Sequence, residues 1–587
     1  MSAFLFIFAV SGFYNLFGCK YIEYQRNTHT TMKRTIFFFL VVLTMTQGWA
    51  RKVKTLPQTL HNYPSGVIDE YHFRPGYVVV RGCVKDIPSN KYGTLSLVGE
   101  DIFLCKDFVE TIKVDSTGRF CASVLIPHSQ FFYFGNLAWP FVAVGDTLDV
   151  TITGHPETGD ETVVCAGTGV TGEVNRVWPR LDEQFFSGKT MKEPWKIKGR
   201  QDMLEWKKQA LEEFRAVVCA IDADTIGLLD GCSDFTRDVL KSSLLARIPH
   251  LIGVACLRAR WAARDGQLGV PSERSVSAQE AWDFLHECES YILDNPCMIF
   301  AFDGKFLINK LEFGPLDAYL FLGNQLNREC SSLDPKPLTN YKENFVLPTF
   351  YDSKMHRKMR EHYQDRLLSV ADYYQMASDS ICSRYRLHNN FMMQICLLHA
   401  VLDMEEETAE EQYLYTMAER FAGAIPLFTD KIVAHRAVDA YRKFVVSKEG
   451  HKPEVSLSPE GDALFNALLE KYKGNVIFMD LWGLGCGPCR AGMLHQRADV
   501  EYFKDKPVRF LYLCNEKDSP RDLSEEFMNS NGIKGEHIYL TEDEWNHLAK
   551  KFQFAGIPFC VLIDKEGNIV SRKNGVTRSM IETLLAQ

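Results

Sequence analysis

Three patterns of apolar and polar residues follow one another along the chain. Between about residues 70 and 170, short stretches alternate apolar with polar side chains, as where Leu148, Val150 and Ile152 stand between polar neighbours. A period of two is typical of strands with one buried face. The turn sequence at residues 115–118 separates two such stretches as the turn of a hairpin would. We therefore predict a small antiparallel β-sandwich over residues 70–170.

From about residue 175 to residue 450 the apolar residues recur with the period of a helix. One such stretch places five large apolar side chains on a broad shared face, and similar stretches lie near residues 277–293, 366–388 and 408–445. No strict repeat length emerges, so a solenoid is not indicated. The acidic run at 403–411 reads as a solvated helix face. We predict a mainly α-helical region over residues 175–450. The five side chains of the shared face are Met203, Trp206, Leu211, Phe214 and Val218.

Residues 452–587 alternate apolar runs of strand length with helical periods. Val476–Trp482 is almost continuously apolar, as expected of a strand buried on both faces, and such strands occur in α/β domains. We therefore predict an α/β domain with a buried central strand. The other predicted strands are 508–514, 559–563 and 568–571, and the predicted helices are 489–503, 521–531, 542–552 and 577–585.

The length and composition agree with several folded domains. The chain has 587 residues, too many for one core. Hydrophobic residues make up 46% and charged residues 24%, as in ordinary globular proteins. The formal net charge of −9 would repel phosphates, so no nucleic-acid partner is expected. The 17 cysteines are too sparse for a small disulfide-stapled fold, and we expect most of them to be buried thiols.

The N-terminal region carries the features of a secretory signal peptide at residues 32–50. Lys33 and Arg34 precede an apolar run at 36–43, and a small-x-small sequence ends at Ala50, where we predict cleavage. The run is shorter than the roughly 20 residues that span a bilayer, so membrane association is possible but not favoured. We expect a periplasmic or otherwise exported protein. Residues 1–31 are interpreted as an upstream extension.

A pair of cysteines stands where the buried strand gives way to a helix. Cys486 and Cys489 are three residues apart in the sequence Cys-Gly-Pro-Cys, close enough to form a disulfide. In thiol–disulfide exchange one thiolate attacks a partner disulfide, and a second thiol must then resolve the mixed disulfide before the partner leaves. The positive end of the following helix and the charge of Arg490 favour a thiolate at Cys486.

These residues resemble the thioredoxin family, and the exported multi-domain context resembles its TlpA/ResA-like branch of Bacteroidetes type, over the last quarter of the chain. The resemblance implies a thioredoxin fold in which Asp480 is a buried carboxylate that accepts or relays the proton of Cys489. It also implies that Pro558 lies in cis against the disulfide and that Glu516 places a carboxylate near it.

The same resemblance predicts the surface that meets a client, meaning the protein whose disulfide is exchanged. Trp482, Ile557 and Pro558 are the residues expected to bind it. Gly485 departs from the family, which usually has Trp just before the nucleophile, so client preference is left open. Around residues 143–148 and 167–175 the chain also resembles the N-terminal β-domain attached to many exported thioredoxin-like proteins of Bacteroidetes type.

Other chemistries for this motif are less favoured. Zinc would need two further ligands, and the chain has no second Cys-x-x-Cys. Haem attachment to the motif would need His where Arg490 stands. No metal and no cofactor is therefore expected. Cys514 and Cys560 are interpreted as core thiols, with a second redox pair as the alternative.

The function predicted from these features is that of an exported protein-disulfide oxidoreductase. Gly487-Pro488 is the dipeptide of reducing thioredoxins, which favours a reductase whose partners are disulfide-containing proteins and an upstream thiol reductant protein. A disulfide oxidase or isomerase is an alternative. Another is a non-enzymatic binding or scaffold protein that retains a thioredoxin domain.

Overall fold

The computed structural model describes most of residues 56–586. The predicted extension at 1–31, the predicted signal peptide at 32–50 and the acidic run at 403–411 lie outside the described residues. Within the range 56–586, the residues not described are 57–59, 62, 66–67, 88–91, 136, 156–159, 187–193, 195–196, 198, 266–275, 318–368, 403–416, 450–456 and 573–575.

The N-terminal strands form two larger sheets and one small one. Their orders are β4-β1-β8-β9, β3-β2-β6 and β5-β7. Val80, Leu97 and Val150, which come from both larger sheets, belong to one apolar core. β1 runs parallel to β8, so the prediction of purely antiparallel pairing is wrong at that pair. The strands are β1 Gly76–Lys85, β2 Thr94–Asp101, β3 Lys106–Lys113, β4 Arg119–Ile126, β5 Gln130–Phe131, β6 Tyr133–Phe134, β7 Phe141–Val142, β8 Thr147–Gly154 and β9 Glu161–Gly167.

Two sequence predictions about these strands have different outcomes. The alternation in β8 is confirmed, because Leu148, Val150 and Ile152 are buried while the residues between them are half-buried. The turn at 115–118 exists, held by the Asp115 carboxylate, which accepts hydrogen bonds from backbone N–H groups including that of Thr117 at 2.8 Å. It does not close a hairpin, however, because β3 pairs with β2 and β4 pairs with β1. The chain changes sheets at this turn.

Helices dominate the described residues from 169 to 449. The predicted helical stretch at 277–293 consists of short helical pieces of different type. The stretch predicted at 408–445 is interrupted by a 3-10 turn at Ile425–Leu427. Pro426 has no backbone N–H to donate to the hydrogen bond that a continuing helix needs. Asp234–Ala259 in α5 is long and apolar enough to cross a membrane, but 83% of the tested window is buried inside the protein. The helices are α3 Gly169–Phe186, α4 Arg200–Asp222, α5 Asp234–Asp265, α6 Ala278–Trp282, α7 Gly304–Glu312, α11 Val370–Tyr385, α12 Phe391–Leu402, α13 Met417–Ala424 and α14 Lys431–Glu449.

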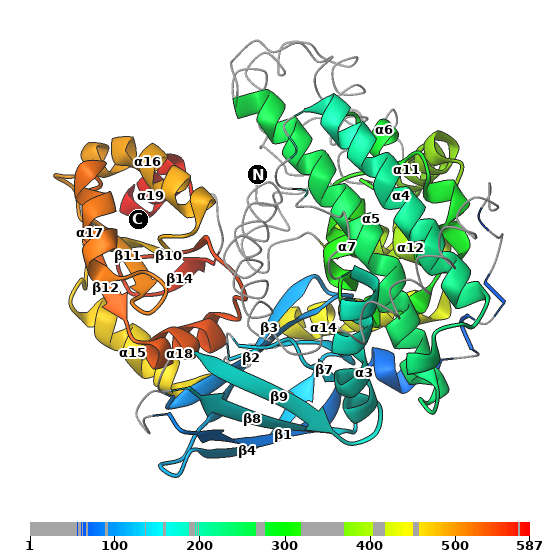
Figure 1. Ribbon diagram of the computed structural model, residues 1–587. Coiled ribbons are helices and arrows are strands. Elements are labelled where there is room, and N and C mark those ends of the chain that lie inside the picture. Colours follow the sequence, from blue (N-terminus) through cyan, green and yellow to red (C-terminus); the bar gives the residue numbers. More distant parts are fainter. Residues whose placement is uncertain are drawn as a thin grey trace.

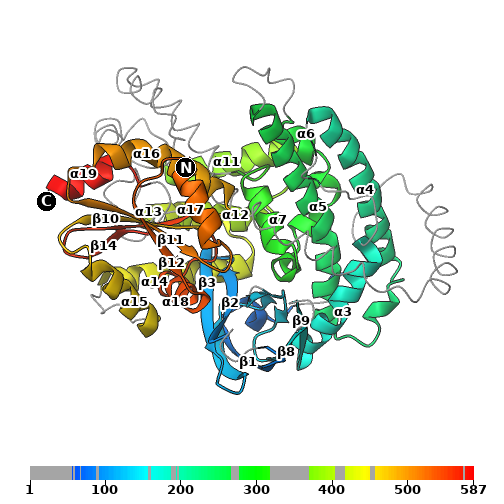
Figure 2. The same ribbon diagram turned by 60° about the vertical axis from the view of Figure 1, so that its left-hand side comes forward.

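The C-terminal residues form a five-stranded sheet of order β12-β11-β10-β13-β14 with helices on both faces. β10 is central, parallel to β11 and antiparallel to β13, and all seven of its residues are buried. The sequence predictions missed α15 and β12. Figure 2 shows α16 and α19 on one face of this sheet and α15 and α18 on the other. The elements are α15 Pro459–Glu470, β10 Val476–Trp482, α16 Gly487–Tyr502, β11 Val508–Asn515, α17 Arg521–Ser530, β12 Glu536–Leu540, α18 Glu542–Phe552, β13 Phe559–Ile563, β14 Ile569–Ser571 and α19 Arg578–Ala586.

Each face of this sheet has its own apolar core. The core on the α16 side is called the disulfide-side core here because it includes both cysteines of the motif, and the core beneath α15 and α18 is called the α18-side core. The α18-side core also contains Val109 of β3, so an N-terminal strand takes part in the core of the C-terminal domain. The disulfide-side core consists of Val476, Phe478, Trp482, Cys486, Cys489, Met493, Phe503, Val508, Phe510, Tyr512, Cys514, Met528, Ile533, Cys560, Leu562, Ile581 and Leu584.

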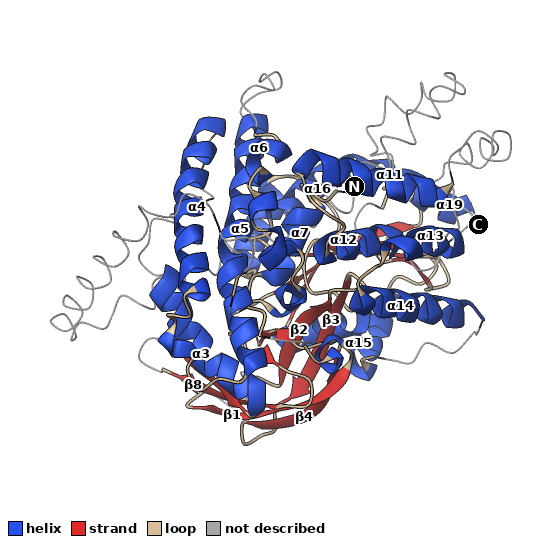
Figure 3. Ribbon diagram, turned by 90° about the vertical axis from the view of Figure 1, so that its right-hand side faces the viewer, coloured by secondary structure: helices blue, strands red, loops and turns tan. Residues whose placement is uncertain are grey.

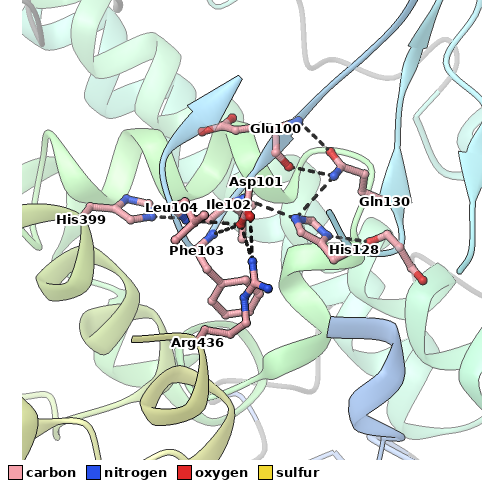
Figure 4. A network of polar contacts seen from close by, with 10 residues as sticks. Glu100, Asp101, Ile102, Phe103, Leu104, His128, Gln130, His399 and Arg436 are labelled. Carbon is pink, nitrogen blue, oxygen red and sulfur yellow. Dashed lines mark hydrogen bonds and ion pairs between the residues drawn. The ribbon is translucent and has the colours of Figure 1, made fainter. Parts of the chain in front are cut away.

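The N-terminal sheets lie between the other two parts of the molecule. In Figure 1 the C-terminal domain and the helices α4, α5 and α7 stand on opposite sides, with strands β1 to β9 below them. Figure 3 shows α4, α5 and α7 side by side above the same strands. The β2–β3 hairpin contacts α18 of the C-terminal domain, and its turn contacts the helical region through Arg436 of α14 and His399 of α12 (Figure 4).

Candidate active site

A disulfide joins Cys486 and Cys489 where β10 leads into α16, with the two Cα atoms 5.3 Å apart. Cys486 is the N-cap of the helix, and its sulfur accepts a hydrogen bond of 3.1 Å from the backbone N–H of Cys489. The free N–H groups of a first helical turn and the helix dipole favour negative charge at this position. Cys486 is 8% exposed and Cys489 is 1% exposed, so Cys486 is the more accessible of the two residues.

The loop before Cys486 is held from two sides. The hydroxyl of Ser519 accepts a hydrogen bond of 2.9 Å from the Leu484 N–H, and the Gly483 carbonyl accepts one of 2.9 Å from the Cys486 N–H. A Cβ added at Gly483 would lie 2.9 Å from Cδ1 of Ile557. Glycine at this position therefore lets the Ile557 side chain approach the loop closely. Gly485 is exposed, next to Cys486.

The loop before β13 is the second wall of the site. The Ile557–Pro558 peptide bond is cis, and both residues are half-buried. Ile557 packs against the disulfide-side core, which includes Cys486. The structure thus brings the motif loop and the Pro558 loop together.

Asp480 lies in the middle of β10 and is 3% exposed. It faces the disulfide-side core, because its neighbours at positions i−2 and i+2, Phe478 and Trp482, both belong to that core. Burial raises the pKa of Asp480 from 3.8 to about 7. The Cys560 thiol donates a hydrogen bond of 3.7 Å to the Asp480 carboxylate. This hydrogen bond lowers the pKa of Asp480, because a donor stabilises the charged form of the carboxylate. A carboxyl group with a pKa near neutrality can both release and accept a proton at neutral pH.

Asp480 is the centre of a row that crosses three strands. It pairs in register with Tyr512 of β11 on one side and with Cys560 of β13 on the other. The Tyr512 ring stacks on His537 at 5.4 Å, and its buried hydroxyl has no hydrogen-bond partner within the described part of the chain. Burial, and secondarily the Asp480 charge, raise the pKa of Tyr512 above its ordinary range. Cys560 likewise has its pKa raised by burial first and by Asp480 next.

Two other predicted site residues lie at the ends of β10 and β11. Trp482 is 1% exposed, packs on Phe527 with ring centroids 6.0 Å apart and belongs to the same core as the two cysteines of the motif. Glu516 follows β11 on the surface, where its carboxylate pairs with Arg521 at 3.3 Å. Arg490 is exposed, with its guanidinium 5.8 Å from the centre of the Phe527 ring.

The remaining cysteines divide differently from the prediction. Among the described residues, six of the 13 free cysteines are buried, Cys514 and Cys560 included, five are half-buried, and Cys105 and Cys121 are exposed. The expectation that most would be buried is therefore wrong for the described part. No group of three or more His, Cys, Asp or Glu side chains in that part could hold a metal ion.

The sequence analysis missed the contacts that support the site. These are the Cys560 hydrogen bond to Asp480, the Ser519 hydrogen bond to the motif loop and the packing of β3 against the segment before Pro558. A cysteine two residues after the proline was visible in the sequence. Its pairing with Asp480 depends on a strand register that the sequence alone does not specify.

Comparison with known proteins places the C-terminal domain in a family. The Redoxin family model matches residues 453–585. The thiol-disulfide oxidoreductase ResA of Bacillus thuringiensis subsp. konkukian is 25% identical over 118 residues, which are 20% of this chain and 65% of that protein, and ResA of Bacillus cereus matches equally. The chain thus spans just under two thirds of the length of these relatives.

Solved structures are similar over a fifth of the chain. The thioredoxin domain of a thiol-disulfide oxidoreductase from Bacteroides vulgatus is 22% identical, with 20% of this chain and 80% of that chain covered and a TM-score of 0.18. StoA from Bacillus subtilis is 18% identical, with 20% and 84% covered and a TM-score of 0.17. From the Redoxin match and the ResA relatives, the C-terminal part of this chain belongs to the thioredoxin-like proteins and is of the TlpA/ResA-like kind.

Proposed function

We propose that this protein is an exported thiol-disulfide oxidoreductase that reduces protein disulfides through Cys486 and Cys489. The observation that carries the proposal is the disulfide at the N-terminus of α16, beside the cis Pro558 loop and on the same face of the sheet as the buried Asp480. The similarity to ResA supports the same class of chemistry.

The reaction begins from the reduced dithiol. The Cys486 thiolate attacks one sulfur of a client disulfide, so that a Cys486–client disulfide forms and the other client sulfur leaves as a thiolate. The Cys489 thiolate then attacks the Cys486 sulfur, which forms the Cys486–Cys489 disulfide and releases the second client sulfur. Two electrons pass to the client, which takes up two protons, and the protein is left oxidised. A dithiol reductant protein must return two electrons by the reverse exchange.

The neighbouring residues assist this exchange. Asp480 takes the proton from Cys489 before the resolving step, because a carboxyl group with a pKa of about 7 is partly ionised at neutral pH. Ile557 and Pro558 offer backbone to an extended client segment, which adds to the loop as a further strand would. Trp482 stabilises the motif loop by packing in the core that includes both cysteines. Glu516 contributes negative charge at the end of β11.

Export and the wider architecture belong to the same proposal. The basic and apolar residues before Ala50 support cleavage there and a periplasmic or otherwise exported location. Disulfide-containing proteins and a thiol reductant protein are the proposed partners. For residues 76–167 we propose the β-sandwich class, because residues of both larger sheets share one core.

Reduction of insulin by the purified protein, with dithiothreitol as electron donor, tests the proposal through the turbidity of the released B chain. Activity is expected in the wild type and absent in Cys486→Ser. Equal activity in that variant would refute the assignment. A redox titration of the Cys486–Cys489 pair then separates a reductase from an oxidase or isomerase, because an oxidase would have a markedly higher reduction potential.

A further inference from the structure

Strand β3 of the N-terminal region has a free edge that the C-terminal domain covers. β3 is the outermost strand of its sheet, so the backbone groups on its outer side have no neighbouring strand. The Gln553 side chain pairs with this edge in both directions. Its amide oxygen accepts a hydrogen bond of 3.2 Å from the Val109 N–H, and its amide nitrogen donates one of 2.9 Å to the Val109 carbonyl.

Gln553 occupies a backbone conformation that normally favours glycine. It caps the C-terminus of α18 with φ 51° and ψ 55°, in the left-handed region. Glycine would adopt this conformation without steric cost, but glycine has no amide to offer to Val109. The backbone geometry at residue 553 favours glycine, which has no side chain. The Gln553 side chain is nevertheless present and joins the two parts of the chain.

A second contact lies two residues further on. The Asp107 carboxylate accepts a hydrogen bond of 2.8 Å from the Ala555 N–H. The segments 553–555 and 107–109 therefore lie antiparallel to each other. Gln553 contacts Val109, and two residues further along each segment Ala555 contacts Asp107. Only Gly556 and Ile557 separate Ala555 from Pro558. The segment that leads into the Pro558 loop is therefore attached to β3 directly before the loop begins.

The hairpin that carries β3 is itself attached to the helical region (Figure 4). At its turn, the Asp101 carboxylate accepts hydrogen bonds of 2.7 and 2.8 Å from one guanidinium nitrogen of Arg436, and the Ile102 carbonyl contacts the His399 ring. β3 thus belongs to a hairpin that is bonded to the helical region at its turn and to the C-terminal domain along its outer edge.

We propose that Asp107 and Gln553 are positioning residues that hold the Pro558 loop in the conformation that binds an extended client polypeptide. The inference rests on the proposed function and extends it, because it makes the N-terminal hairpin part of client recognition. Polypeptide clients pair with loop backbone, whereas a small disulfide needs only access to Cys486. The two positioning residues therefore affect the first kind of substrate and leave the second unaffected.

The test compares two substrates in the full-length protein. In the double variant Asp107→Ala/Gln553→Gly, kcat/KM for insulin is expected to fall about tenfold, mainly through KM, because the lost interactions act in binding. The reaction of the reduced protein with a small aromatic disulfide is expected to stay within about twofold of the wild type, as expected when only client docking is impaired. Gln553→Gly alone suits the local backbone and guards against a folding failure of the double variant. Asp107→Asn retains a carbonyl oxygen as acceptor and is expected to restore much of the loss.

Lys113→Ala is the matched control. It removes the ion pair of Lys113 with Glu460, which joins the same two parts of the chain but lies at the other end of β3 from Asp107. Insulin reduction in this variant is expected to match the wild type. Equal losses with insulin and the small disulfide, equal losses in the control, or no loss in the double variant would each overturn the proposal.

A readout without activity separates this proposal from the proposed function. Hydrogen–deuterium exchange of the peptide covering 553–559 is expected to be faster in the double variant and unchanged in Lys113→Ala, because the Ala555 N–H loses its acceptor. If exchange is faster in the double variant but the wild type does not reduce insulin, the proposed function is refuted while the positioning contact is supported. Unchanged exchange would refute the positioning contact, whatever the activity.

Discussion

The Cys560 thiol donates a hydrogen bond of 3.7 Å to the Asp480 carboxylate, and the two residues face each other across β10 and β13. Both are buried on the side of the sheet that carries the disulfide. The groups facing Asp480 from the neighbouring strands are this thiol and the phenol of Tyr512, and both are uncharged at neutral pH. The proton affinity of Asp480 therefore depends on burial and on the Cys560 donor.

Cys560→Ala is expected to shift the pH dependence of the resolving step upward. Loss of the donor raises the pKa of Asp480 further above 7, so a higher pH is needed to ionise the carboxyl group that accepts the Cys489 proton. We expect the midpoint of the rate profile to rise by about 0.5 to 1 pH unit. Stopped-flow resolution of a mixed disulfide on Cys486 measures it.

Cys514→Ala serves as the control for this experiment, because Cys514 is a buried cysteine of the same core whose pKa is shifted by burial and Glu516 rather than by Asp480. Its profile is expected to coincide with that of the wild type. Cys560→Ser supplies a stronger donor and is expected to move the midpoint downward. A Cys560→Ala midpoint equal to the wild-type value would contradict the prediction.

The burial of Asp480 also predicts a pH-dependent stability of the C-terminal domain. The pKa of Asp480 is about 7 in the folded protein and near 3.8 when unfolded, so the folded state binds more protons between these values. The free energy of unfolding must therefore fall as pH rises from about 4 to about 7. At about 1.4 kcal/mol per pKa unit, the upper bound of this loss is about 4 kcal/mol.

Asp480→Asn removes this titration. The variant is expected to be more stable than the wild type at pH 8 and to lose its advantage towards pH 4. Pulse proteolysis in urea at each pH measures it, because cleavage of the C-terminal domain reports its unfolded fraction. A constant difference between the two proteins across this range would argue against a raised pKa.

The sequence predicted the cysteine motif and its strand more fully than the contacts that hold the site in place. Val476–Trp482 is an almost continuous apolar run, and β10 has the same bounds, while the helix predicted from residue 489 begins two residues earlier, at Gly487. β12 at 536–540 was missed because four of its five residues are half-buried and show no alternation. The contact of Cys560 with Asp480 depends on strand register, which joins residues 80 positions apart.

The packing between the parts of the chain could not be predicted from local patterns. Val109 reads as an ordinary strand residue, yet it belongs to the core beneath α18. Asp107 and Gln553 are polar residues at a strand start and a helix end, positions where polar residues are common. Their roles come from contacts across more than 440 residues, and such contacts leave no period in the sequence.

His399 predicts a second pH dependence of the free energy of unfolding, at higher pH than the one predicted from Asp480. Burial alone would lower its pKa, but the charge of Glu312, a hydrogen bond to that carboxylate at 3.1 Å and the Ile102 carbonyl together raise it to about 9. A histidine whose folded pKa exceeds its unfolded value of 6.5 stabilises the fold below pH 6.5, and this contribution is lost as pH rises through 9.

His399→Gln is expected to abolish that loss between pH 6.5 and 9 while lowering stability at pH 6. Urea unfolding at several pH values measures it, with Cys396→Ala as a control on the same helix. The control is expected to lower stability by the same amount from pH 6 to about 8, because the Cys396 thiol is neutral over this range in both the folded and the unfolded protein. A His399→Gln protein with the wild-type pH dependence would contradict the assignment.

Arg436→Met is expected to destabilise the attachment of the β2–β3 hairpin to the helical region. Arg436 and Asp101 are buried and bonded at 2.7 and 2.8 Å, so removal of the cation leaves an uncompensated buried carboxylate. Such losses cost about 3 to 5 kcal/mol. Urea unfolding measures the change, and Arg74→Met, which removes an exposed pair with Glu70, is expected to cost less than about 1 kcal/mol.

The double variant Arg436→Met/Asp101→Asn distinguishes a lost charge pair from lost packing. Asn retains an oxygen for the N–H groups of Phe103 and Leu104, which bond to Asp101 at 3.2 and 3.3 Å, but it carries no charge. If the buried charge is the cause, the double variant is more stable than Arg436→Met alone, because the carboxylate that lacked a partner is gone. If the packing of the Arg436 guanidinium over the Phe103 ring is the cause, the second substitution brings no recovery. We expect recovery, because the guanidinium bonds both oxygens of a carboxylate that has little access to water.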